Sequence, residues 1–157
     1  MMNSFGQIFR LTDFGETHGK CVGGVIDGCP SGLFVDVEFV QSELDRRVPH
    51  KGDPISSQRA ENDCVEFLSG IYEGKTTGAP IAFIVQNQDG KPNWENNRLL
   101  KPSHASFVLK EKFGHQCNEQ GGRFSARQTV CRVVAGAIAK LILKRQTTLR
   151  IVLVQLA

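Results

Sequence analysis

The segment GGRFSARQT, residues 121–129, holds residue types that bind anions. Ser125 and Gln128 have the S-x-x-Q form of a capping box, which predicts that a helix begins at Ser125. The start of a helix offers unpaired N–H groups and a positive dipole potential, and Arg123 and Arg127 flank it here. The pattern therefore favours a site for phosphate or carboxylate. The alternative is that Ser125 only caps the helix and that both arginines are solvated.

Two histidines stand where a proton donor could act. His18 lies in GETHG, residues 15–19, whose glycines permit tight turns and the close approach of a ligand. His104 follows Lys-Pro-Ser at a predicted junction between a loop and a helix. An imidazole has an ordinary pKa of about 6.5, so either side chain could serve as a general acid near neutral pH. The alternative is that each is a surface or hydrogen-bonding residue.

Arg46 and Arg47 end a predicted helix. A planar guanidinium suits carboxylate and phosphate groups, although paired charges at a helix end are also commonly solvated. No H-x-x-x-H or paired-carboxylate spacing accompanies the histidines, so the sequence does not favour a metal site.

Charge is distributed unevenly over the 157 residues, whose formal net charge is +3. The segment 120–157 carries seven basic residues and no acid, so it is +7 and residues 1–119 are −4. Nucleic-acid binding would favour basic residues interleaved with aromatics, yet this segment has one aromatic, Phe124. A small phosphate or carboxylate ligand is the preferred expectation, with no nucleic-acid or membrane partner.

Five cysteines without a C-x-x-C pair indicate neither a zinc knuckle nor a disulfide framework. The first residues lack the pattern of a signal peptide, and the apolar runs are shorter than the roughly 18 residues of a spanning helix. We therefore expect a cytoplasmic protein.

Hydrophobic periodicity predicts an α+β chain of about four strands and three helices. The predicted elements are strands over 20–27 and 33–37, a helix capped by Asp36 and ending at Arg47, a hairpin of 64–72 and 80–86, a helix over 105–113 and a helix from Ser125 through 142. Residues 48–63 and 87–103 are predicted loops.

Together these segments resemble the chorismate synthase family. GETHGKCVGGVIDGCP (15–30) is similar to the family's first signature, and GRFSARQTVCRVVAGAI (122–138) is similar to its second. Between them LDRRVP (44–49), EFLSGIYEGKTTGAPIAFIVQN (66–87) and KPSHASF (101–107) follow the family's order. The resemblance runs from about residue 3 to about residue 144 and covers less than half of a usual family member.

The resemblance implies part of an α/β sandwich with helices packed on antiparallel sheet. It also implies a lyase of the shikimate pathway to aromatic amino acids, which converts 5-enolpyruvylshikimate 3-phosphate to chorismate by 1,4-elimination of phosphate. The implied cofactor is reduced FMN, with NADPH as a candidate reductant, and the family assembles as a homotetramer.

Site residues carry over by position. His18 and His104 match the family's catalytic histidines, which handle protons. Arg47 and Arg127 match substrate-binding arginines. The flavin site is matched by Arg123, Phe124 and Ser125. The sequence departs from the family pattern at Val48, Ser106, Cys117, Glu119, Phe124 and Gln128.

Residues 1–144 are therefore expected to form the N-terminal portion of a chorismate synthase-like domain. Residues 145–157 do not resemble the family and are expected to be a foreign tail, of the kind that a disrupted reading frame would produce. We expect little activity from the chain alone. The alternative is a non-enzymatic flavin- or anion-binding fragment, or a subunit completed by another chain.

Overall fold

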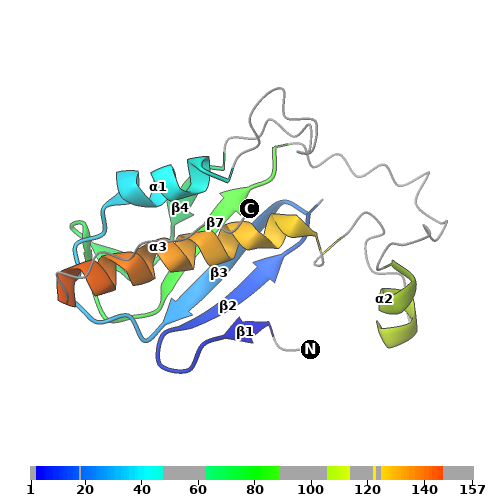
Figure 1. Cartoon of the computed structure of the whole chain (residues 1–157), viewed down its shortest axis with the longest axis horizontal. Helices are drawn as coiled ribbons and strands as arrows, with labels where there is room; N and C mark the ends of the chain where they lie inside the picture. The colour runs from blue at the N-terminus through cyan, green and yellow to red at the C-terminus, as the bar shows by residue number, and fades with distance from the viewer. Residues whose placement is uncertain are drawn as a thin grey trace, which may run out of the picture.

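The computed structural model describes residues 3–17, 19–47, 63–88, 106–113, 122 and 125–146. Among these, five antiparallel strands form one sheet in the order β1-β2-β3-β7-β4 (Figure 1). The strands of this sheet are β1 (Ser4–Phe5), β2 (Arg10–Gly15), β3 (Cys21–Asp27), β4 (Val65–Phe67) and β7 (Ile81–Gln86). Two short strands, β5 (Ile71–Tyr72) and β6 (Lys75–Thr76), pair separately.

β3 is the central strand, and its glycines allow dense packing. It pairs with β2 from Arg10 opposite Asp27 to Gly15 opposite Val22, and its other edge pairs with β7. A Cβ atom at Gly24 would lie 2.8 Å from Cδ1 of Leu11 and 2.9 Å from Cζ of Phe83. Glycine at this position therefore leaves room for the Phe83 ring, which is fully buried.

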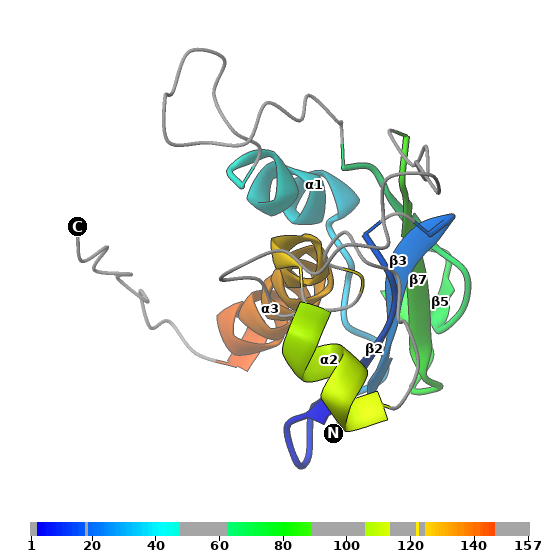
Figure 2. The same cartoon turned by 90° about the vertical axis from the view of Figure 1, so that its right-hand side faces the viewer.

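Helices α1 (Val37–Asp45) and α3 (Thr129–Gln146) cover one face of the sheet (Figure 2). α1 begins where Oδ1 of Asp36 accepts a hydrogen bond from N of Phe39 at 2.9 Å, which satisfies one of the free N–H groups of the first turn. A third helix, α2, spans Ser106–Phe113. Immediately before α3, residues Ala126–Gln128 form the 3-10 turn η3.

The core lies between the sheet and these two helices. Its fully buried members include Val22, Ile26, Ile81, Phe83 and Val85 from the sheet, Val40 and Leu44 from α1, and Val130, Val134 and Ile138 from α3. Burial raises the pKa of the Cys29 thiol at the edge of this core, although a hydrogen bond with the Thr76 side chain opposes the rise.

An ion pair also joins the two covering helices. Nζ of Lys140 lies 2.5 Å from Oε2 of Glu43, and Nη1 of Arg46 lies 3.2 Å from Oε1. Burial by itself would raise the pKa of Glu43, but the hydrogen bonds and charges of Lys140 and Arg46 outweigh it and hold the pKa below its ordinary value.

Several predicted elements are confirmed. The strand predicted over 20–27 is β3, and the predicted hairpin is the antiparallel pair β4 and β7. Asp36 caps α1 as expected. Most of the periodic face of the last helix is buried in the core, as is the neighbouring Cys131, while Val133 and Ile142 are partly buried. An antiparallel sheet with helices packed on it agrees with the α+β fold class.

Other predictions were wrong. Leu33 to Val37 do not form a strand, because their pairing is limited to one bridge between Phe34 and Lys75 and α1 already begins at Val37. Strands β1 and β2 were not predicted. The first strand of the predicted hairpin, 64–72, is divided: β4 ends at Phe67, and residues 71–72 form β5, which pairs with β6 in the connection between β4 and β7.

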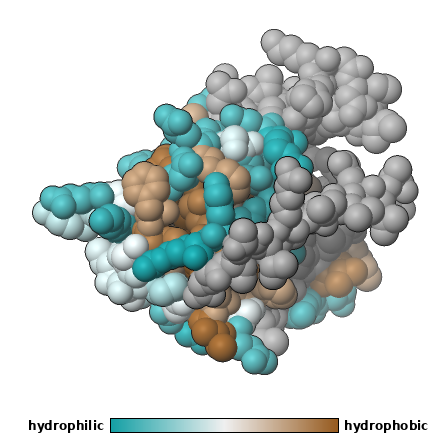
Figure 3. Space-filling view, turned by 60° about the vertical axis from the view of Figure 1, so that its left-hand side comes forward, coloured by the Kyte–Doolittle hydropathy of each residue, from teal (hydrophilic) through white to brown (hydrophobic). Residues whose placement is uncertain are grey.

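The surface of the described residues includes exposed apolar groups. Figure 3 shows apolar patches between polar ones. Over all faces of the described part, the exposed large apolar side chains include Phe5, Ile8, Phe34, Tyr72 and Leu143. Groups of this kind suit contact with further polypeptide when they are contiguous.

Candidate functional site

Two segments far apart in the sequence meet at the start of α3. The hydroxyl and the backbone N–H of Thr17 both donate to the carbonyl oxygen of Gly122, at 2.7 and 3.0 Å. Nε2 of Gln128 donates to the carbonyl oxygen of Gly15 at 2.7 Å. The turn that follows β2 is therefore fixed against the segment that leads into η3 and α3.

Asn87, just beyond β7, also fixes this turn. Its Nδ2 donates to the carbonyl oxygens of Glu16 and Gly19 at 2.9 and 2.8 Å. Its backbone N–H donates to the carbonyl oxygen of Lys20 at 3.1 Å. Oδ1 of the same amide accepts from Nε of Arg127 at 2.9 Å. One amide side chain thus links the turn to η3.

Arg127 is a buried cation with several partners. Its side chain is 5% exposed and forms an ion pair through Nη1 with Oδ1 of Asp63. Nη2 donates to the carbonyl oxygen of Gln86 at 3.2 Å, in addition to the contact of Nε with Asn87. Its backbone N–H donates to Oγ of Ser125 at 3.3 Å. A buried charge requires such pairing, since its desolvation is otherwise costly.

Asp63 joins this arginine to a second one at the end of α1. Oδ2 of Asp63 pairs with Nη1 of Arg47, whose side chain is 23% exposed. Nη2 of Arg47 also lies 3.4 Å from Oγ1 of Thr129. Arg47, Asp63 and Arg127 therefore form one ionic cluster, called here the Asp63 cluster, beside the first turn of α3.

The structure brings together three of the residues that the sequence singled out. Arg47 and Arg127 share a carboxylate, and Ser125 caps η3 next to them. The capping box is only half formed, because the Gln128 side chain donates to Gly15 rather than back to Ser125. The remaining predicted site residues, His18, His104, Arg123 and Phe124, lie outside the described residues.

Comparison with known proteins decides the family. The sequence model of the chorismate synthase family matches residues 9–156. The chain belongs to the chorismate synthase family. A chorismate synthase of Bacteroides thetaiotaomicron is 57% identical over 147 residues, and that of Azobacteroides pseudotrichonymphae is 54% identical over 147 residues. Each alignment covers 92% of this chain and 41% of the relative.

A solved structure gives the same result. A crystal structure of chorismate synthase superposes with a TM-score of 0.66 at 30% sequence identity, over 88% of this chain and 35% of that one. The chain therefore spans about two fifths of the length of its chorismate synthase relatives. The family match includes most of 145–157, and the expected boundary at Lys144 stays a prediction.

Sequence reasoning missed Asp63 and Asn87. Asp63 ends a segment predicted as a loop, and Asn87 begins another, so neither position carries a local pattern. Only the short NDC stretch before β4 places an acid next to an apolar strand, which is a weak signal for a buried carboxylate. Their importance arises from contacts with residues 16 to 71 positions away.

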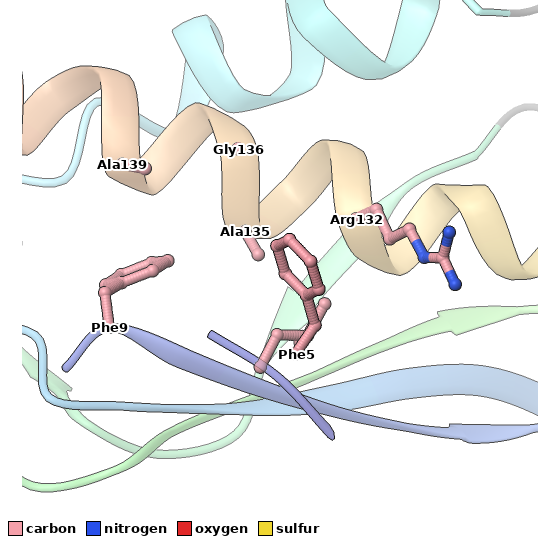
Figure 4. Close-up of a pocket in the computed structure, with 7 residues that line it drawn as sticks. Phe5, Phe9, Arg132, Ala135, Gly136 and Ala139 are labelled. Carbon is pink, nitrogen blue, oxygen red and sulfur yellow. The ribbon is translucent and has the colours of Figure 1, made fainter. Parts of the chain in front are cut away.

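Two hollows lie near these elements. A shallow one of about 340 Å³ lies along the turn after β2 and is lined in part by the charged residues Asp13, Glu16 and Lys20. The other, of about 300 Å³, is mostly apolar and lies between the first strands and α3 (Figure 4). There the rings of Phe5 and Phe9 face α3, which contributes Ala135 among others. The shallow hollow adjoins the turn of the site, and its charged lining residues are two acids and one lysine.

Within the described part of the chain, no three His, Cys, Asp or Glu side chains are grouped as a metal site would require. None of the described helices has the length and apolar character of a membrane-spanning segment.

Proposed function

We propose that this chain supplies part of the site at which chorismate synthase converts 5-enolpyruvylshikimate 3-phosphate to chorismate and phosphate with reduced FMN. The observation that supports the proposal is the Asp63 cluster, which gathers two arginines beside a helix start and the turn at 15–19. Because the chain spans 41% of its relatives, we expect little turnover from it alone.

The proposed substrate carries phosphate and carboxylate groups, which guanidinium binds well. Arg47 is the proposed direct ligand, since its side chain is 23% exposed. Arg127 contributes its positive charge to the substrate site, while the described contacts of its guanidinium are made to protein groups. The positive charges of both arginines therefore favour an anion beside Arg47.

The charges of the described residues around Ser125 are suited to an anionic cofactor. Residues 125–146 contain no acid, and η3 begins at the cap formed by Ser125, where the helix dipole is positive. Ser125, together with Arg123 and Phe124, would hold reduced FMN. When bound, the reduced flavin would supply the electron density that assists loss of phosphate.

His18 and His104 are the proposed proton donors of the reaction, with imidazole suited to proton transfer near neutral pH. The residues next to His18 are held in place, because Thr17 bonds to Gly122 and Gly19 bonds to Asn87. The finer assignments to a cytoplasmic, homotetrameric flavoprotein lyase with NADPH as reductant follow from the family and are part of this proposal.

The proposal is tested by titrating the chain with 5-enolpyruvylshikimate 3-phosphate in a calorimeter, with and without reduced FMN. We expect saturable binding that Arg47→Ala weakens about tenfold, the equivalent of one charge-assisted hydrogen bond. Arg10→Ala is the matched control, because Arg10 pairs with Asp27 at an exposed site. Absence of binding by the unaltered chain would overturn the proposal.

A second candidate is a subunit completed by another chain. The chorismate synthase of Bacteroides thetaiotaomicron is matched over 41% of its length, and this candidate assigns the rest of the site to the second chain. The test mixes this chain with the remaining segment of that relative and assays chorismate with reduced FMN. Turnover only in the mixture supports a completed site, whereas flavin binding without turnover indicates a non-enzymatic binding fragment.

A further inference from the structure

The carboxylate of Asp63 is the most deeply buried charged group of the Asp63 cluster, with 2% of its side chain exposed. The residue is tied to α1 through its backbone, because Nε2 of Gln41 donates to its carbonyl oxygen at 2.8 Å. Each carboxylate oxygen faces a different guanidinium, Oδ1 that of Arg127 and Oδ2 that of Arg47. A carboxylate held in this way defines where both cations lie.

The two arginines differ in how many other contacts fix them. Arg127 is 5% exposed and also bonds to Asn87 and to the carbonyl oxygen of Gln86. Arg47 is 23% exposed, and besides Asp63 it reaches only Thr129 among the described residues. A guanidinium has five N–H donors, so Arg47 keeps donors for a ligand. Arg127 is therefore the anchor of the cluster, and Arg47 is its open end.

The charges of the cluster favour an anion at that open end. The carboxylate of Asp63 is shared between the two guanidinium groups. It is the only described ionic partner of Arg47, so part of the positive charge of Arg47 stays available where this side chain reaches solvent. The carboxylate therefore orients Arg47 without abolishing its attraction for a phosphate or carboxylate group.

We infer that Asp63 is a positioning residue: anchored by Arg127, its carboxylate holds the guanidinium of Arg47 in the orientation that binds an anionic group of the ligand. This inference rests on the proposed function for the identity of that ligand. It assigns Asp63 no contact with the ligand, so its effect on binding passes through Arg47.

The first test needs no ligand. Side-chain nitrogen NMR of the whole chain reports rotation about the Cζ–Nη bonds of each arginine. We expect resolved Nη signals for Arg47 in the unaltered chain and averaged signals in Asp63→Asn, while backbone signals of β3 and α3 keep their positions. Asp27→Asn is the control, since it removes the same charge from an exposed pair with Arg10. Unchanged Arg47 signals in Asp63→Asn would overturn the inference.

The second test is a double-mutant cycle with 5-enolpyruvylshikimate 3-phosphate as the probe. Asp63→Asn should weaken binding about tenfold in the unaltered background and by less than about twofold when Arg47→Ala is already present. A merely structural role predicts equal losses in both backgrounds and overturns the inference. If the unaltered chain does not bind the probe, the proposed function fails, and the NMR result alone decides the role of Asp63.

Because Asp63→Asn removes an ionic partner of the buried Arg127 and is expected to destabilise the chain, a second variant keeps the charge. Asp63→Glu retains the charge but displaces the carboxylate by one methylene. In this variant we expect circular dichroism to show that the fold is retained. The Nη signals of Arg47 in the NMR spectrum should nevertheless shift. Signals identical to those of the unaltered chain would count against positioning by Asp63.

Discussion

Nε of Arg127 lies 2.9 Å from Oδ1 of Asn87, while Nδ2 of the same amide bonds to the carbonyl oxygens of Glu16 and Gly19. One side chain therefore connects the ionic cluster beside α3 to the turn after β2. The two signatures of the chorismate synthase family are brought together by this connection and by the bond of Thr17 to Gly122. Binding of an anion and the order of the turn should consequently be coupled.

Replacing Asn87 by alanine should destabilise the chain by about 1–3 kcal/mol, because partly buried donors and acceptors lose their partners. Urea unfolding measures this change. Hydrogen exchange should also quicken at the N–H of Gly19, which bonds to the carbonyl oxygen of Glu16. Gln88→Ala is the control, since Gln88 is an exposed neighbouring amide and should change stability by less than about 0.5 kcal/mol. Equal effects of the two substitutions would contradict the role given to Asn87.

Replacing either of two glycines by alanine should change the stability of the chain in opposite directions. At Gly24 a Cβ atom would lie within 2.9 Å of Leu11 and Phe83, so Gly24→Ala should cost about 1–3 kcal/mol through overpacking. At Gly136, within α3, a Cβ atom meets nothing within 4 Å. Gly136→Ala should therefore stabilise the chain by roughly 0.5–1 kcal/mol through helix propensity. Thermal unfolding of both variants measures the sign of each change in stability. Destabilisation by Gly136→Ala as well would show that the space beside Gly136 does not accept a methyl group.

The Ser125 cap gives a local prediction. Ser125→Ala removes the acceptor for N of Arg127 and should cost about 1 kcal/mol, whereas Ser125→Asn retains a capping oxygen and should cost little. Denaturant unfolding of the two variants measures the difference. Equal losses in both would indicate that the hydroxyl does not act as a cap.

The sequence predicted those elements whose burial follows a local rule. Val40 and Leu44 are spaced for one helix face, and Asp36 is a cap residue in front of them. β2 escaped prediction because its inward positions hold Leu11, Asp13 and Gly15, of which only one is a large apolar residue. The alternation that identifies a strand is absent there.

The candidate site was predictable only in part for a related reason. Ser125 and Arg127 could be recognised by type and by their place at a helix start, and Arg47 by its type at a helix end. Asp63 and Asn87 act through partners distant in the sequence, and neither spacing nor composition indicates such partners. The direction of the Gln128 side chain was likewise decided by the carbonyl of Gly15, a tertiary contact that outcompetes the local capping box.

The ion pair of Glu43 and Lys140 predicts how stability depends on pH. Interactions with Lys140 and Arg46 hold the pKa of Glu43 below its ordinary value of 4.5 in the folded chain. The unfolded chain then binds the proton more readily, so this contribution to stability is present above the ordinary pKa and is lost as the pH falls through the lower folded value.

Lys140→Gln removes the main partner that lowers the pKa of Glu43, and it should reduce the acid-induced loss of stability. Urea unfolding between about pH 6 and pH 3 measures it, with Lys144→Gln as the control on the same helix. Identical pH profiles for Lys140→Gln and the unaltered chain would show that this pair does not link α1 to α3 energetically.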